Sequence, residues 1–123
     1  MRLRPNPQLV AWMEQHRAAS AIAASTWHEL WFGCYRLVPS AKREFFETYL
    51  MNVAVTLPIL PYNERAAAWH ALERARLMTL GMTPAFIDGQ IAAVAVTHEL
   101  ALLTFNLSDY RDFNGLSLTS LTV

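Results

Sequence analysis

Apolar positions follow two different spacings along this chain, one typical of helices and the other of buried strands. Apolar residues that recur every three or four positions predict helices over about 7–16, 26–37, 41–55, 64–80 and 84–98. Short apolar runs between them predict strands at about 21–24, 57–60, 100–104 and 116–121. The polar stretch 106–114 predicts a loop or a single helical turn.

Capping residues mark the ends of these helices. The expected helix starts are Thr26 with Glu29 at capping-box spacing, Ser40, Asn63 and the pair Thr83-Pro84. Gly81 is expected to end the helix over 64–80, because glycine adopts the left-handed backbone that commonly follows a helix.

Short strands alternating with helices predict an α/β fold with a mainly parallel sheet. A chain of 123 residues supports one domain over 1–123. The strands over 21–24 and 57–60 are weak, because one is rich in alanine and the other contains prolines. The predicted sheet is therefore one strong strand short.

Composition narrows the class of protein. Hydrophobic residues make up 54% of the chain and charged residues 16%, which excludes disorder. The formal net charge is zero, so the chain is not a simple basic coat for nucleic acid. The single cysteine, Cys34, cannot form an internal disulfide. We expect no membrane span and no signal peptide, and a cytoplasmic location.

Acidic and amide side chains follow the predicted strands or begin the predicted helices. These residues are Glu29, Asp88, Asn106 and Asp109. Ligands gather at the carboxyl ends of parallel strands, so all of them can face one pocket. Converging carboxylates need a cation, and oxygen ligands favour Mg²⁺ or Mn²⁺, whose natural chemistry here is phosphodiester hydrolysis. Taken alone, each acid is more often a residue that simply complements a helix dipole.

Asp88 is the most unusual of these residues. It lies in an apolar helix, where a buried charge is costly without a partner or a metal. The next residue, Gly89, weakens a helix relative to alanine. We expect the close approach of another backbone to explain this glycine.

Several motifs, in order, resemble the PIN-domain toxins of the VapC/FitB type, from bacterial type II toxin–antitoxin pairs. That family has an Ala-Asp-Gly-Xaa-Ile-Ala-Ala helix and then a Thr-Arg-Asn-Xaa-Xaa-Asp-Phe strand end. The corresponding segments here are 86–93, Phe-Ile-Asp-Gly-Gln-Ile-Ala-Ala, and 104–110, Thr-Phe-Asn-Leu-Ser-Asp-Tyr. Segment 25–33 resembles the family's Ser-Xaa-Xaa-Xaa-Glu-Leu-Xaa-Xaa-Gly, 4–12 the segment after its first strand, and 114–116 its last turn. The likeness spans essentially the whole chain.

The resemblance implies a PIN-like three-layer sandwich and a Mg²⁺- or Mn²⁺-dependent endoribonuclease, in which a metal-activated water hydrolyses RNA. By motif, Glu29, Asp88 and Asp109 are the implied catalytic acids and metal ligands, with Asn106 as a further ligand. Thr104 is the implied polar support at the strand end. The implied partners are RNA, a cognate antitoxin and a second copy of the chain.

Two features depart from the family pattern. Phe105 stands where the family has arginine. The family begins with a central strand that carries its first catalytic aspartate. This sequence has no matching segment, because Met1 falls after that strand. Three explanations for the missing strand are open: a truncated gene product or a start site assigned too late, a decayed toxin, or a strand supplied by another chain. Without that strand we expect exposed strand edges, marginal stability and weaker metal binding.

Other polar and aromatic residues have structural interpretations. His16, His28, His70 and His98 lack metal-ligand spacing and are expected in structural or surface roles. The arginines Arg65, Arg74 and Arg76 indicate a solvated helix face or an RNA-facing edge. A cluster of four aromatic residues and a leucine favours a dimer or antitoxin groove and comprises Trp27, Trp31, Phe32, Tyr35 and Leu37. The alternative function is a PIN module without catalysis that only dimerises or binds an antitoxin.

Overall fold

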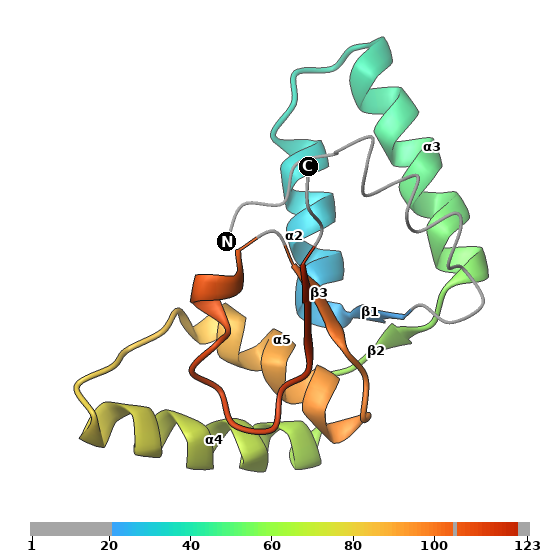
Figure 1. The fold of residues 1–123 in the computed structure, drawn as a ribbon. Coiled ribbons are helices and arrows are strands. Elements are labelled where there is room, and N and C mark those ends of the chain that lie inside the picture. The colour runs from blue at the N-terminus through green and yellow to red at the C-terminus, as the bar shows by residue number, and fades with distance from the viewer. Residues whose placement is uncertain (1–20, 105, 121–123) are drawn as a thin grey trace. The chain divides into compact units, whose positions relative to one another are not determined.

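The computed structural model describes residues 21–104 and 106–120 (Figure 1). The helix expected over 7–16 lies outside them. The chain divides into two compact units, 2–60 and 61–123. A single domain over 1–123 stays a prediction.

In the unit 2–60, a short strand β1 (Ile22–Ala23) leads directly into helix α2 (Ala24–Tyr35). Helix α3 (Ala41–Thr56) packs against α2 and leads to strand β2 (Ile59–Leu60). The two strands pair in parallel, and Ile22 N donates to Pro58 O at 2.9 Å. Buried Ile22, Val53 and Leu57 form the local core. The half-buried side chains of Trp27, Tyr49 and Ile59 pack against this core.

In the unit 61–123, helices α4 (Glu64–Thr79) and α5 (Phe86–Thr97) pack against each other (Figure 1). Strand β3 (Leu102–Thr104) pairs in parallel with β4 (Leu118–Ser120). Between these strands, the 3-10 helix η2 (Leu107–Asp109) confirms the single helical turn predicted in 106–114. Most of α5 is buried. This helix is therefore the centre of the unit.

The capping predictions had mixed outcomes. The Ser40 side chain accepts from Arg43 N, and that of Asn63 from Ala66 N, as predicted. Gly81 has φ +75° and follows the last turn of α4, where Met82 N donates to Leu77 O at 2.9 Å. The capping box at Thr26 is wrong: α2 begins at Ala24, so Thr26 lies inside the helix.

The starts and ends of two helices also differ from prediction. Helix α5 begins at Phe86 rather than at Pro84, and its N-cap, Ala85, makes no side-chain hydrogen bond. Helix α2 ends at Tyr35, two residues before the predicted end at Leu37, whose N–H instead donates to Cys34 O at 3.1 Å. Backbone hydrogen bonds at the turns set these helix boundaries, and the pattern of side chains predicts them only to within about one or two residues.

Both strand ladders are parallel, which confirms the predicted α/β class and sheet type. They form two two-stranded sheets among the described residues. The absence of a central first strand stays a prediction. No helix in the described part of the chain has both the length and the apolar character needed to cross a bilayer.

Candidate metal centre

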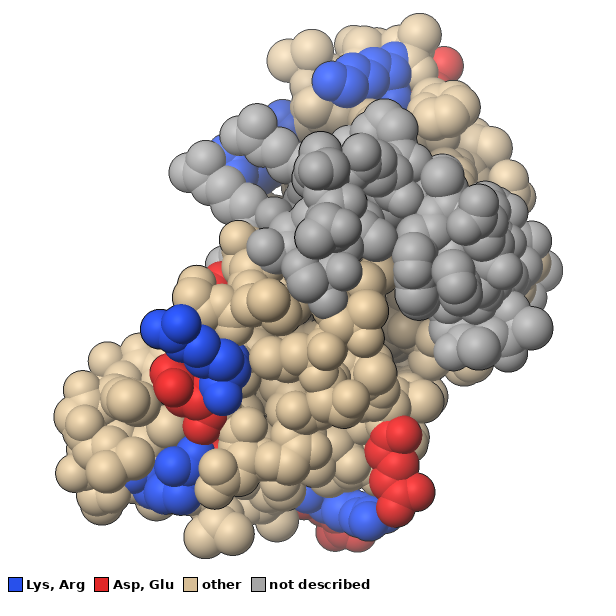
Figure 2. Space-filling view, in the orientation of Figure 1, with Lys and Arg blue, Asp and Glu red and all other residues tan. Residues whose placement is uncertain are grey.

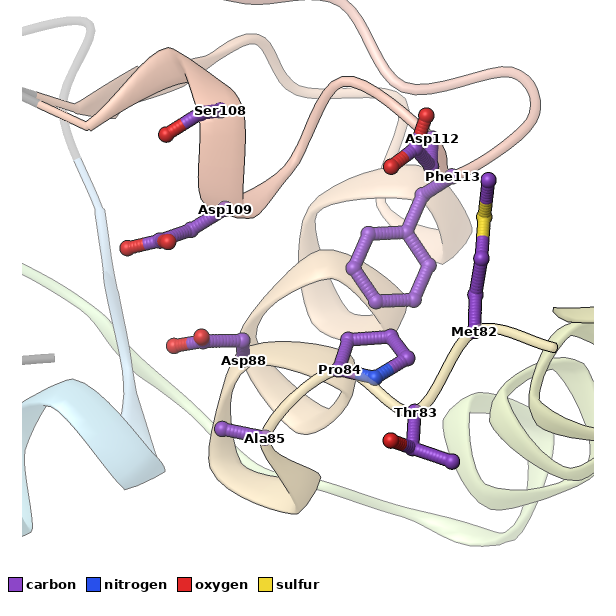
Figure 3. Close-up of a pocket in the computed structure, with 9 residues that line it drawn as sticks. All are labelled: Met82, Thr83, Pro84, Ala85, Asp88, Ser108, Asp109, Asp112 and Phe113. Atoms are coloured by element: carbon purple, nitrogen blue, oxygen red, sulfur yellow. The ribbon is translucent and has the colours of Figure 1, made fainter. Parts of the chain in front are cut away.

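A pocket of about 480 Å³ opens in the unit 61–123. It lies where the α4–α5 connection, the first turn of α5 and the segment after β3 meet (Figure 3). Its lining residues are Met82, Thr83, Pro84, Ala85, Asp88, Ser108, Asp109, Asp112 and Phe113. Two of the predicted metal ligands, Asp88 and Asp109, therefore share one pocket.

The two carboxylates point the same way. In Figure 3 the side chains of Asp88 and Asp109 extend toward one side of the pocket, with Ser108 on that side as well. Asp112 lies at the other end, beyond Phe113. Asp88 is buried, with 5% of its surface exposed, whereas Asp109 is exposed. The pocket therefore holds one fixed acid and one acid open to solvent.

A tyrosine holds the buried acid in place. Asp88 lies in the first turn of α5, and the Tyr110 hydroxyl donates to its Oδ1 at 3.2 Å. Tyr110 is 1% exposed, so this hydrogen bond is shielded from water. Tyr110 stands where the family pattern has phenylalanine, and that substitution was the sequence signal for a role that sequence reasoning missed.

Electrostatics favour a cation beside these acids. Burial raises the pKa of Asp88, the Tyr110 hydrogen bond opposes that rise, and the negative charge of Asp109 adds to it. Burial and the charge of Asp88 raise the pKa of Tyr110, which keeps its hydroxyl protonated as a donor. A bound cation would relieve both the desolvation of Asp88 and the repulsion by Asp109.

The donor set suits Mg²⁺, which keeps several waters and needs only one or two protein carboxylates. In the described ranges, 21–104 and 106–120, no group of three or more His, Cys, Asp or Glu residues forms a possible metal site. The unit 61–123 thus provides two carboxylates at this pocket, not a complete set of metal ligands.

The remaining predicted site residues have separate places. Glu29 belongs to the unit 2–60, where its Oε1 lies 3.4 Å from His28 Nδ1, and its role as a ligand stays a prediction. Asn106 is exposed and lies outside the lining of this pocket. Its N–H donates to the hydroxyl of buried Thr104 at 3.0 Å, so Thr104 shapes the turn after β3. Phe105 lies outside the described residues.

Gly89 has a different cause from the one expected. A Cβ at this position would overlap the imidazole of His70, so a side chain and not another backbone requires the glycine. His70 is buried, its Nδ1 lies 2.8 Å from the Tyr62 hydroxyl, and its ring lies 4.7 Å from that of Phe86. The structural role predicted for His70 is confirmed.

The comparisons with known proteins agree with this fold. The chain matches no protein-family model. Toxin FitB of Neisseria gonorrhoeae is 32% identical in an alignment 123 positions long, which covers 93% of this chain and 88% of that protein. The crystal structure of FitAcB from Neisseria gonorrhoeae matches with a TM-score of 0.80 and 28% identity, over 95% of this chain and 86% of that one.

A more distant structure shares the fold alone. VapBC2 from Rickettsia felis, bound to a DNA fragment from its promoter, matches with a TM-score of 0.78 and 20% identity, over 95% of this chain and 87% of that chain. The fold and the paired acids therefore define a PIN-like α/β protein. This chain belongs to the family of PIN-domain toxins of the VapC/FitB type, the toxin components of type II toxin–antitoxin pairs.

Proposed function

We propose that this protein is a divalent-metal-dependent endoribonuclease, acting as the toxin of a type II toxin–antitoxin pair. The observation that carries the proposal is the pocket in which Asp88 and Asp109 present their carboxylates to the same side (Figure 3). Family membership supports it, because the same two residues match the acids of the family motifs.

In this proposal Asp88 and Asp109 hold Mg²⁺ or Mn²⁺. Tyr110 keeps the Asp88 carboxylate oriented through its hydrogen bond to Oδ1. Glu29 is the third proposed acid, and Asn106 a further ligand. When bound, the cation supplies an activated water for attack on the phosphodiester and stabilises the charge that develops.

Among the described residues, the face drawn in Figure 2 carries no broad basic surface. On the face drawn in Figure 2, Lys and Arg lie next to Asp and Glu instead of forming a field of one sign. The formal net charge of zero agrees with this. Contacts of phosphate oxygens with the metal are therefore expected to supply much of the affinity, and binding should depend strongly on the cation.

Cleavage of a single-stranded RNA tests the proposal. The wild-type chain with Mg²⁺ or Mn²⁺ should cleave it and should stop when EDTA is added. Asp88→Asn should lower the rate at least about 100-fold, because it removes a charge that the cation needs. The matched control is Asp112→Asn, in the same pocket but away from the acid pair, and it should cleave normally. Cleavage in EDTA, or equal rates for both variants, would contradict the proposal.

A PIN module without catalysis is the second candidate, favoured because the described residues bring no three potential metal ligands together. A thermal shift with Mn²⁺ separates the two functions. A rise in melting temperature that Asp88→Asn removes supports the metal-dependent enzyme. No shift, together with no cleavage, supports the binding module.

We also propose an antitoxin as a partner of this chain. The aromatic residues of this cluster on α2 have different environments. Trp27 packs on the core of its unit, whereas Phe32 and Tyr35 are 50% and 55% exposed. The rings of Trp31 and Tyr35 stack with centroids 5.3 Å apart. Exposed, preordered aromatic groups of this kind are enriched in protein interfaces. Phe32→Ser should weaken antitoxin binding without altering RNA cleavage.

A further inference from the structure

An unusual ion pair lies on α4, away from the pocket lining. Glu73 is only 5% exposed, whereas Arg65 and Arg74 on the same helix are exposed. Arg76 donates to both oxygens of Glu73, from Nε to Oε2 and from Nη2 to Oε1, each at 2.9 Å. A solvated pair at this spacing stabilises a helix only slightly. Since burying a carboxylate costs more than that, helix stability does not explain the pair.

The same two side chains hold a distant piece of backbone. Asn114 N donates to Glu73 Oε1 at 2.7 Å, and Arg76 Nη2 donates to Asp112 O at 2.7 Å. Both bonds are short and involve a charged group, so they are among the strong hydrogen bonds of the unit. The pair therefore fixes the turn over 112–114 to α4.

That turn is continuous with the acid pair. Phe113 N donates to Tyr110 O at 3.2 Å, and Tyr110 N to Leu107 O at 3.1 Å. Asp109 N donates to Asn106 O at 3.1 Å. Consecutive turns of this kind leave little freedom between their ends. Fixing the turn over 112–114 therefore also restricts where Asp109 can lie.

We propose that Glu73 and Arg76 are positioning residues for the candidate metal centre. They hold the segment 106–114 to α4, so that the carboxylate of Asp109 stays beside that of Asp88. The inference rests on the proposed function in one respect, that the paired acids bind a divalent cation.

Amide hydrogen exchange without metal tests the positioning. Glu73→Gln keeps the shape and one acceptor oxygen of the side chain but removes its charge. The amides of Asp109, Tyr110 and Phe113 should exchange about tenfold faster in this variant, while those of α5 stay unchanged. The matched control is Arg65→Gln, an exposed change on the same helix, which should alter none of them. Unchanged rates for 109–113 in Glu73→Gln would overturn the inference.

Mn²⁺ affinity, measured by titration with electron paramagnetic resonance, supplies the second readout. Glu73→Gln should weaken binding about threefold to tenfold. It should have no further effect in an Asp109→Asn background, because the pair acts through Asp109. Equal weakening in both backgrounds would show a general structural effect and overturn the inference. If Glu73→Gln does not fold, Arg76→Lys replaces it, because lysine keeps the charge but not the forked geometry.

The two readouts separate this inference from the proposed function. Wild-type protein that binds no Mn²⁺ contradicts the proposed function. The metal-free exchange rates then still decide whether Glu73 and Arg76 position the segment.

Discussion

Helices α5 and α3 are both rich in apolar residues, but they use them in different ways. In the 12 residues of α5, Ile91 through Ala95 are all buried, and so is Asp88. In the 16 residues of α3, Leu50 and Val53 are buried, while Phe45 and Met51 are 66% and 63% exposed. A helix that is apolar all round belongs in an interior, and α5 fits that rule. The exposed apolar side chains of α3 instead show that one face of this helix lies at the surface of its unit.

The difference matters because the candidate site depends on α5. Asp88 is itself buried in a helix that is mostly buried, so the core of its unit holds it as well as Tyr110 does. Helix α3 carries none of the acids of the site. We therefore expect stability and metal binding to depend on α5 much more than on the outer face of α3.

The largest expected effect comes from a cavity in α5. Ile91 is 2% exposed, and Ile91→Ala should lower the free energy of unfolding by about 2–5 kcal/mol. Met51→Ala on the exposed face of α3 should change it by less than about 0.5 kcal/mol. Urea unfolding followed by circular dichroism measures both. Similar losses for the two variants would break the comparison between the helices.

A smaller effect is expected from overpacking at Gly89. Gly89→Ala brings a Cβ into the imidazole of His70 and should cost about 1–3 kcal/mol of stability. The double variant with His70→Ala should lose less than the sum of the single changes, because the smaller side chain leaves room. Additive losses in a double-mutant cycle would show that the ring is not the cause.

Much of the fold was predictable because it follows from local rules. Ser40 and Asn63 cap their helices through their own side chains, and Gly81 ends α4 with a positive φ that glycine favours. Thr26 failed as a cap because the chain enters α2 directly from β1, and strand pairing with the distant β2 fixes that entry.

The candidate site was predictable only in part. Asp88 and Asp109 were predicted to face one pocket because acids near a helix start and a strand end converge in parallel folds, and both do line one pocket. The burial of Glu73 was not foreseen, since Glu and Arg three residues apart usually lie on a solvated face. Its distant partner is the N–H of Asn114, and a backbone group has no side-chain signature in the sequence.

A single hydroxyl is expected to stabilise the acid of α5. Tyr110→Phe keeps the ring in its buried place but removes the hydrogen bond to Asp88, and should cost about 1 kcal/mol. The control is Tyr35→Phe on α2, where the ring is 55% exposed and stability should hardly change. Guanidinium unfolding measures both, and a Tyr110→Phe protein as stable as wild type would contradict the anchoring of Asp88.

The smallest expected effect is a pH dependence of stability that comes from His70 on α4, beside α5. Burial, with a further contribution from the Arg74 charge, lowers the pKa of His70 below its ordinary value of 6.5. The unfolded chain therefore binds a proton at His70 more readily than the folded chain does. The stability that His70 contributes is complete above pH 6.5 and is lost as pH falls below that value toward the folded pKa.

Urea unfolding at pH 7.5 and 5.5 measures this contribution. His70→Gln does not titrate in this range and keeps a polar partner for the Tyr62 hydroxyl. The loss of stability on acidification should therefore be smaller in this variant than in the wild type. The control is His28→Gln on α2, where the side chain is 70% exposed, and its loss should match that of the wild type. If His70→Gln lost as much stability as the wild type, His70 would not be the group responsible.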